Sequence, residues 1–170
     1  MQTLISADDI QRRVHEMAAD MSRRYPNGVH LVCVLKGAFV FLADLMREMT
    51  GDVTCDFIAL SSYGVGTKSS GEVRLLKDLD RGLEGRDVVI IEDIVDTGLT
   101  LSYLQEILRA RAPHLLRTAC LLSKPSRRKV QVQVEYIGFT IEDLFVVGYG
   151  LDFERRYRNL PDIAVYQPGS

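Results

Sequence analysis

The sequence lacks tryptophan, long apolar runs and a dense set of cysteines. Its three cysteines, Cys33, Cys55 and Cys120, are odd in number and far apart, which argues against a disulfide framework and a zinc knuckle. We expect buried free thiols in a reducing cytoplasm. No apolar segment reaches the ~20 residues that span a bilayer, and the first residues lack the apolar core of a signal peptide. A cytoplasmic protein without a membrane partner is therefore expected.

The chain also lacks an excess of charge of one sign, since 21 Lys and Arg face 23 Asp and Glu for a net charge of −2. Without a global basic field, generic binding of nucleic acid has no support. Hydrophobic residues make up 46% of the chain, as in ordinary globular proteins, and its 170 residues suit a single domain over 1–170. The histidines, His15, His30 and His114, have no metal-ligand spacing and are assigned no function.

Apolar periodicity predicts helices that alternate with strands. Ser6, with Asp9 three residues later, resembles a capping box and opens a helix that Tyr25 to Gly28 ends. A second helix is expected in "AFVFLADLMREM" and a third on the face from Leu101 to Leu108, before Pro113. Strands are expected in "VHLVCVLKG", "VTCDFIAL", "EVRLLKDL", Val88 to Ile91, "LLRTACLLS", "VQVQVEYIGF" and "LFVVGYGL".

Strands that alternate with helices and are apolar enough for burial on both faces predict an α/β fold with a parallel sheet. Ligands of such sheets bind beyond the carboxyl ends of the strands. Four strand ends are therefore of interest: 35–37, 92–100, 123–124 and 145–152. In addition, Ser61 to Gly71 is rich in glycine and serine, which predicts a mobile surface loop long enough to form a lid.

The segment "VVIIEDIVDTGLTL", Val88 to Leu101, ends a strand with acids and small polar residues. Asp96 to Thr100 leads into a helix, so backbone N–H groups and the positive helix end suit a phosphate there. Glu92 and Asp93 would repel a phosphate unless Mg²⁺ or a ribose diol lay between, and a ribose 5-phosphate meets both demands. The spacing matches neither a Walker loop nor GxGxxG. A plain helix cap at Asp96 and Thr97, with exposed acids, is the simpler alternative.

This segment resembles the phosphoribosyl pyrophosphate signature of type I phosphoribosyltransferases. Other segments resemble the hypoxanthine-guanine branch: "LVCVLKGAFVFLADL" its first active-site loop, "SSYG" the start of its flexible loop, "LLSKPSRR" its purine-selecting lysine segment, and "FVVGYGLDFERRYRNLP" its base-stacking and pyrophosphate-binding end. The match runs from about Leu31 to Pro161. It implies a mainly parallel central sheet flanked by helices, with a small hood from the chain ends over the purine site.

The resemblance implies purine salvage: Mg²⁺-dependent transfer of a phosphoribosyl group from phosphoribosyl pyrophosphate to hypoxanthine, guanine or both. Asp96 would be the general base for a purine ring nitrogen and would stabilise an oxocarbenium-like ribose. Glu92 and Asp93 would face the ribose hydroxyls and Mg²⁺, with Asp152 at a second Mg²⁺ or its water shell. The 5′-phosphate would be held by Thr97, Gly98, Leu99 and Thr100, with Leu99 a departure from relatives that carry lysine there.

Around the leaving group and the base, the resemblance implies further roles. The backbone of Lys36 and Gly37, through a cis peptide, would bind pyrophosphate together with Arg158. Lys124 would donate to a purine 6-oxo group and so disfavour adenine. Phe145 would stack on the purine and Val146 would offer its backbone to the base edge, while Ser62 and Tyr63 would lie in the lid. The simpler alternatives are a plain turn at 36–37, a surface lysine at 124, a core Phe145 and a solvated Arg158.

Two other classes of function stay open at this point. One is a nucleotide-sensing, RNA-binding regulator on the same fold, with 124–129 and 155–158 as its basic surface. The other is a phospho-acceptor signalling domain with Asp93 as the acceptor. Relatives of the resembled branch are dimers or tetramers, so a homodimer or homotetramer is expected by analogy. The sequence does not rank hypoxanthine, guanine and xanthine.

Overall fold

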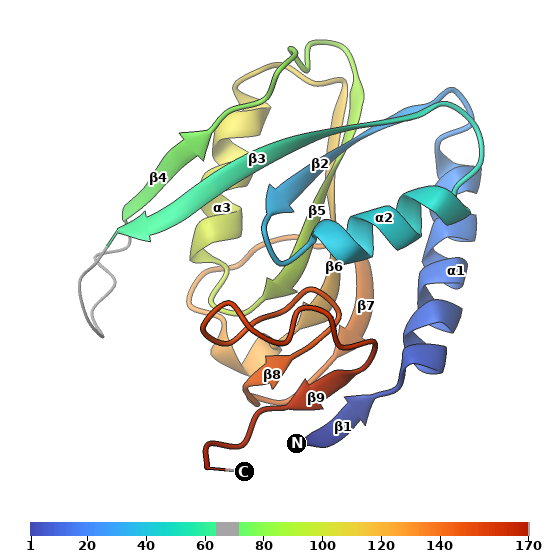
Figure 1. Cartoon of the computed structure of the whole chain (residues 1–170). Helices are drawn as coiled ribbons and strands as arrows, with labels where there is room; N and C mark the ends of the chain where they lie inside the picture. The colour runs from blue at the N-terminus through green and yellow to red at the C-terminus, as the bar shows by residue number, and fades with distance from the viewer. Residues whose placement is uncertain (64–71, 170) are drawn as a thin grey trace.

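The computed structural model describes residues 1–63 and 72–169 (Figure 1). Its largest element is a six-stranded sheet in the order β4-β3-β2-β5-β6-β7, in which β4 is antiparallel to β3 and the other pairs are parallel. The mainly parallel α/β fold expected from the sequence is confirmed. The strands of this sheet are β2 (Val29–Leu35), β3 (Val53–Tyr63), β4 (Glu72–Lys77), β5 (Asp87–Val95), β6 (Leu115–Ser123) and β7 (Tyr136–Thr140).

Helices cover both faces of the sheet: α1 (Ala7–Arg24) and α2 (Phe39–Glu48) lie on one side, and α3 (Leu99–Arg109) lies on the other (Figure 1). The predicted cap of α1 is present, since Ser6 Oγ accepts the Asp9 N–H at 3.2 Å. Alternate residues of β5 enter separate cores, Val89 and Ile91 with α1 and α2, and Val88 and Ile90 with α3. This double burial explains the continuous apolar run of β5.

The two ends of the chain form a second, three-stranded antiparallel sheet in the order β1-β9-β8 (Figure 1). Its strands are β1 (Gln2–Ile5), β8 (Val146–Val147) and β9 (Ile163–Val165). This sheet corresponds to the small hood implied by the resemblance. β1 and β9 were not predicted, because segments of three or four residues carry too little periodicity to be recognised.

Two strands run further than predicted. β5 continues to Val95, so Glu92 and Asp93 are part of the strand and do not follow it. β3 continues to Tyr63, and Ser62 pairs with Val73 of β4, so the predicted loop is wrong for Ser61 to Tyr63. Hydrogen-bonded pairing with β4 makes this segment a strand, although its polar composition predicted a loop. The rest of the predicted lid, 64–71, lies outside the described residues.

Two predicted strands are shorter than expected. In "VQVQVEYIGF" only β7, from Tyr136, is strand, because the alternating valines Val132 and Val134 pack against the α3 core without joining the sheet. In "LFVVGYGL" only Val146 and Val147 are strand. The next residues turn away, with φ of 100° at Gly148 and 51° at Tyr149.

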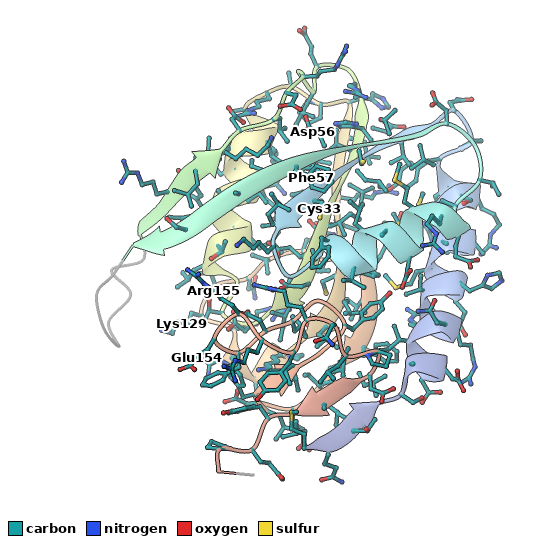
Figure 2. All side chains as sticks on the ribbon, in the orientation of Figure 1. Cys33, Asp56, Phe57, Lys129, Glu154 and Arg155 are labelled. Carbon is teal, nitrogen blue, oxygen red and sulfur yellow. The ribbon has the colours of Figure 1, made fainter. Side chains whose placement is uncertain are left out.

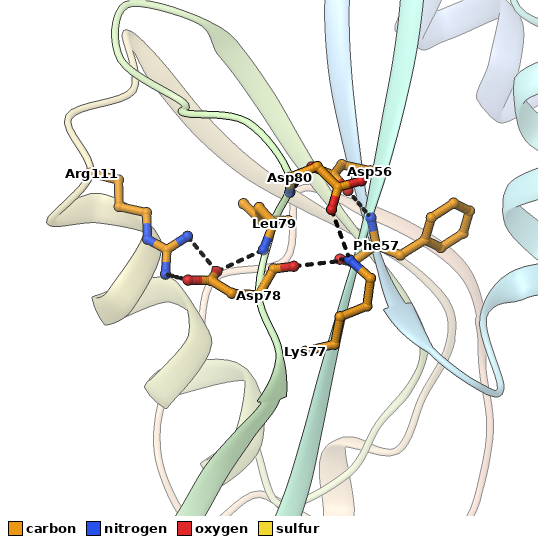
Figure 3. Close-up of polar contacts among 7 residues, drawn as sticks. All are labelled: Asp56, Phe57, Lys77, Asp78, Leu79, Asp80 and Arg111. Carbon is orange, nitrogen blue, oxygen red and sulfur yellow. Dashed lines mark hydrogen bonds and ion pairs between the residues drawn. The ribbon is translucent and has the colours of Figure 1, made fainter.

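A polar network fixes the connection from β4 to β5 against β3 and α3 (Figure 3). Arg111, just past α3, donates to both carboxylate oxygens of Asp78 at 2.6 and 3.0 Å. Asp56 of β3 accepts the N–H of Asp80 at 2.8 Å, and Lys77 Nζ lies 3.5 Å from Asp80 Oδ1. These contacts hold the chain where it crosses the amino ends of the parallel strands.

All three cysteines are free thiols, as expected, but Cys55 is half-buried, while Cys33 and Cys120 are buried. Cys55 lies in the part of β3 that precedes the pairing with β4, which begins at Ala59, so β3 is itself the edge of the sheet there. Among the described residues, no helix has the length and apolarity to cross a membrane.

Candidate active site

Two adjoining cavities lie at the carboxyl ends of β2 and β5. The β5 cavity, of about 230 Å³, is lined by Val34, Leu35, Leu60, residues 92–96, Gly98, Thr100 and Leu101. The outer cavity, of about 500 Å³, is lined by Lys36, Gly37, Asp93, Ile94, Asp96, Lys124, Arg127, Asp143, Phe145, Val146, Leu151, Asp152 and Arg158. Asp93, Ile94 and Asp96 line both cavities, so they stand at the junction.

The cavities bring together most of the residues singled out in the sequence. Of those outside the predicted lid, Thr97 and Leu99 line neither cavity. Two charged lining residues, Arg127 and Asp143, were not among the predicted site residues. Arg127 follows Lys124 by three positions and Asp143 precedes Phe145 by two, so closeness to predicted site residues was the one available signal.

The loop before α3 is shaped by Gly98, which is the N-cap residue and has a φ of 82°. A Cβ at Gly98 would lie 3.1 Å from the Val130 carbonyl oxygen, so glycine suits both the conformation and the space. The simple capping alternative is wrong for Asp96, whose Oδ1 accepts the Thr97 N–H at 2.7 Å outside the helix. Gly98 occupies the N-cap position, but Thr97 Oγ1 accepts the N–H of Leu99, the first helical residue, at 3.3 Å.

The acids of β5 are placed where negative charge is costly. Glu92 is 6% exposed, and burial, followed by the charge of Asp93, raises its pKa well above the ordinary range. Burial also raises the pKa of Asp93, although the Ile94 N–H, which Asp93 Oδ1 accepts at 2.7 Å, opposes the shift. A cation or a sugar diol at this point would relieve the repulsion between the two carboxyl groups.

The turn after β2 lies directly against these acids. The peptide bond between Leu35 and Lys36 is cis, one residue earlier than the pair implied by the resemblance. A Cβ at Gly150 would lie 2.6 Å from the Gly37 carbonyl oxygen, so the 148–152 turn packs closely on this one. The turn is therefore enclosed between β5 and the segment after β8.

Lys124 is a buried lysine, 7% exposed, so the surface alternative is wrong. Its Nζ lies 3.9 Å from Asp143 Oδ1. Burial lowers the pKa of Lys124, while the charges of Asp143 and Asp96 act in the opposite direction. An ammonium group with few partners thus faces the outer cavity.

Phe145 is 54% exposed, so the core alternative is wrong for it too. Its ring meets Phe153 and Tyr166 in edge contacts, with centroids 5.7 and 6.0 Å away and interplanar angles of 90° and 71°. Such supporting contacts fix the ring while leaving it available to a flat ligand. Val146 of β8 lies beside it in the outer cavity.

Arg158 is held in the outer cavity and is not a solvated basic turn. Its Nη1 donates to the Gly150 carbonyl at 2.7 Å, and its Nη2 lies 3.4 Å from Asp152 Oδ1. Asp152 Oδ2 also accepts the Arg155 N–H at 2.8 Å. Among the described residues, no group of three or more His, Cys, Asp or Glu side chains is arranged to hold a metal ion.

The site thus joins an acidic cavity beside a helix N-terminus to a cavity with an aromatic ring and a buried lysine. A model described as the phosphoribosyl transferase domain matches residues 6–154. Hypoxanthine-guanine phosphoribosyltransferase of Bacillus subtilis is 49% identical over 166 residues, which are 97% of this chain and 92% of that protein. The chain belongs to the hypoxanthine-guanine phosphoribosyltransferase family.

Further comparisons agree with this membership. Hypoxanthine phosphoribosyltransferase of Escherichia coli is 46% identical over 96% of this chain and 93% of its own length. A crystal structure of a hypoxanthine-guanine phosphoribosyltransferase from Bacillus anthracis superposes with a TM-score of 0.94 at 46% identity, over 98% of this chain and 99% of that one. The resemblance seen in the sequence is confirmed, and the protein is a phosphoribosyltransferase. A phospho-acceptor domain is therefore not supported.

Proposed function

We propose that this phosphoribosyltransferase transfers the phosphoribosyl group of phosphoribosyl pyrophosphate to hypoxanthine, guanine or both, and releases the nucleotide and pyrophosphate. The observation that carries the proposal is the position of Asp96, which lines the acidic β5 cavity and the outer cavity with Lys124 and Phe145. A sugar phosphate in the first cavity and a purine in the second would meet at this carboxylate.

On the sugar side, the backbone of 97–100 would hold the 5′-phosphate. α3 begins at Leu99, whose N–H donates to Thr97 Oγ1 at 3.3 Å, so the N–H groups that follow it in the first turn and the helix dipole would be offered to an anion. Glu92 and Asp93 would accept hydrogen bonds from the ribose hydroxyls. Leu99 adds no charge, so this site would depend on backbone donors.

On the base side, Phe145 would stack on the purine and the backbone of Val146 would bind its edge. Lys124 carries donors and no acceptor, so it suits a 6-oxo group and disfavours the 6-amino group of adenine. Burial of the Lys124 ammonium strengthens the preference for a 6-oxo group, because opposite adenine its N–H groups would find neither an acceptor nor water.

At the reacting centre, Asp96 would accept the proton from the purine ring nitrogen as the bond to C1′ forms. Its charge would also stabilise the positive ribose as the bond to pyrophosphate breaks. The reaction would proceed by displacement without a covalent enzyme intermediate. The pyrophosphate would be bound by Lys36, Gly37 and Arg158.

The chemistry of the site fits Mg²⁺. Asp93 and Asp152 offer carboxylate oxygens to the outer cavity, and Glu92 offers one to the β5 cavity. Mg²⁺ is held by one or two carboxylates together with water and substrate phosphates, so a site without a three-residue cluster agrees with it. When bound, the ion neutralises polyphosphate charge.

Other parts of the proposal rest on the family. Ser62 and Tyr63 would begin a lid that excludes water, and the protein would be a cytoplasmic homodimer or homotetramer. An RNA-binding regulator has less support, because two of the cations assigned to its surface are engaged elsewhere. Lys124 is buried, and Arg128 donates to backbone carbonyls.

The deciding experiment measures nucleotide formation from hypoxanthine, guanine, xanthine and adenine with phosphoribosyl pyrophosphate, with and without Mg²⁺. We expect product from hypoxanthine or guanine, none from adenine, and loss of activity when Mg²⁺ is chelated. Activity on adenine alone, or on none of the bases, would overturn the proposal.

A further inference from the structure

Arg128 connects the segments that carry Asp96 and Lys124. Its Nη1 donates to the carbonyl oxygens of Asp96 at 2.8 Å, Val95 at 2.9 Å and Lys124 at 3.3 Å. Its Nη2 donates to Ser123 Oγ at 2.9 Å. One guanidinium thus binds the residues at the ends of both β5 and β6, whereas the sequence placed Arg128 only in a basic surface.

These bonds occur where the sheet stops holding the two strands together. The last register pair between β5 and β6 is Val95 with Ser123. Beyond it, Asp96 leads toward α3 and Lys124 leads into the short 3₁₀ helix η1 (Pro125–Arg127). The Lys124 N–H still donates to the Val95 carbonyl at 2.9 Å, after which Arg128 supplies the cross-connection.

An arginine suits this place well. Three carbonyl oxygens lie within 3.3 Å of Nη1, and the planar guanidinium directs Nη2 to Ser123 Oγ at the same time, a spread of donors that a single ammonium nitrogen does not offer. Arg128 is half-buried, so these bonds are partly shielded from water. Removal of the guanidinium would leave the carbonyls of Asp96 and Lys124 without this shared donor.

We propose that Arg128 is a positioning residue, which sets the separation between the catalytic carboxylate of Asp96 and the purine-selecting ammonium of Lys124. The inference rests on the proposed function, in which these two groups contact a ring nitrogen and the 6-oxo group of one rigid purine. A fixed separation then determines both the rate and the choice of base.

Its neighbours act differently. Arg127 directs its side chain into the outer cavity, 3.8 Å from Asp96 Oδ2 and 3.3 Å from Asp143 Oδ2, so it contacts side chains and not the backbone. Lys129, labelled in Figure 2, is exposed, and its backbone N–H donates to the Thr97 carbonyl at 2.9 Å. Substitution of the Lys129 side chain keeps that bond and provides a matched control.

The test compares Arg128→Ala, Arg128→Lys and Lys129→Gln by steady-state kinetics with hypoxanthine and adenine. For Arg128→Ala we expect kcat/KM for hypoxanthine to fall about 10²-fold, as misplacement by about 1 Å does elsewhere. The preference for hypoxanthine over adenine should narrow. Arg128→Lys should recover part of the loss, millimolar guanidinium ion should partly restore Arg128→Ala, and Lys129→Gln should match the unmodified protein.

A binding measurement separates positioning from general damage. Arg128→Ala should weaken the binding of GMP, which by the proposed function would span both cavities, more than that of ribose 5-phosphate, which would occupy the sugar side alone. Equal weakening of both ligands, or unchanged kinetics with hypoxanthine, would overturn the inference. Activity of the unmodified protein on hypoxanthine or guanine in the same assay shows that such a result leaves the proposed function intact.

Discussion

The carboxylate of Asp93 lies against the backbone of Gly37: a Cβ built on Gly37 would come within 1.8 Å of Asp93 Oδ2 and 2.9 Å of its Cγ. Only a hydrogen atom fits between the turn after β2 and the acid of β5. Two strand ends that are distant in sequence are thereby held at one fixed separation in the outer cavity.

Gly37→Ala should therefore disturb the site more than the fold. The added methyl group must displace the Asp93 carboxylate, and we expect kcat/KM for phosphoribosyl pyrophosphate to fall about 10²-fold. Gly82→Ala is the matched control, because a Cβ there meets no described atom within 4 Å. Steady-state kinetics on both variants decide the matter, and equal activities would refute a close contact at Gly37.

Asp96→Asn should lower kcat far more than it weakens the binding of phosphoribosyl pyrophosphate. The amide keeps the size of the side chain but neither accepts a proton nor stabilises a positive ribose, so a loss of about 10²–10⁴-fold in kcat is expected. Dissociation constants for phosphoribosyl pyrophosphate give the comparison. A kcat equal to that of the unmodified enzyme would exclude Asp96 as the base.

Lys124 gives an expectation for alkaline pH. Burial lowers its pKa and the charge of Asp143 opposes this shift, so Asp143→Asn should lower the pKa further. Because binding of the 6-oxo group uses the ammonium form, affinity is lost as pH rises through the pKa, and the variant should lose it at lower pH. The KM for hypoxanthine of Asp143→Asn, divided by that of the unmodified enzyme, should then increase between about pH 7 and 10.

The control for this effect is Asp143→Glu, which keeps the charge near Lys124 Nζ. Ionisation of hypoxanthine itself affects all three proteins equally, so it cancels in the ratios of their KM values. KM curves for Asp143→Asn that run parallel to those of the unmodified enzyme at every pH would show that Asp143 does not support the charge of Lys124.

The elements that the sequence predicted well are those with local signals. The Ser6 cap with its apolar stripe defined α1, and the apolar run from Val88 to Ile91 defined the central strand. Because carboxyl ends of parallel strands meet at one edge, the sequence order of motifs was enough to bring Lys124 and Asp96 into one site. Local periodicity, together with the rule that the carboxyl ends of parallel strands meet at one edge of the sheet, accounts for most of the fold.

The missing parts depend on partners far along the chain. β1 and β9 are recognisable only by their pairing in the small sheet, where β9 pairs with both β1 and β8. Val132 and Val134 alternate like a strand although they pack on α3. The roles of Arg128 and Asp143 depend on their contacts with backbone carbonyls and with Lys124, which only the folded chain brings together. Such contacts are tertiary, so no pattern of residues in the sequence predicts them.

Asp56 provides a test of stability away from the site (Figure 3). Its carboxylate is 6% exposed and accepts the N–H groups of Phe57 at 2.7 Å and Asp80 at 2.8 Å. Burial alone would raise its pKa, but these backbone donors, with Arg81 and the charge of Lys77, outweigh burial and lower it. A carboxylate with a lowered pKa stabilises the fold above the unfolded-state value and ceases to do so as pH falls through the folded-state value.

Asp56→Asn should accordingly reduce the free energy of unfolding at pH 7 by about 1–3 kcal/mol, because the amide nitrogen meets buried donors. The difference from the unmodified protein should shrink as pH falls below about 4, because the unfolded chain takes up a proton at Asp56 there, while the folded protein does so only at its lowered pKa. Asp80→Asn, whose carboxylate is 80% exposed, should change little at any pH. Urea unfolding from pH 3 to 7 measures all three proteins, and a difference for Asp56→Asn that stays constant over this range would show that its ionised form does not stabilise the fold.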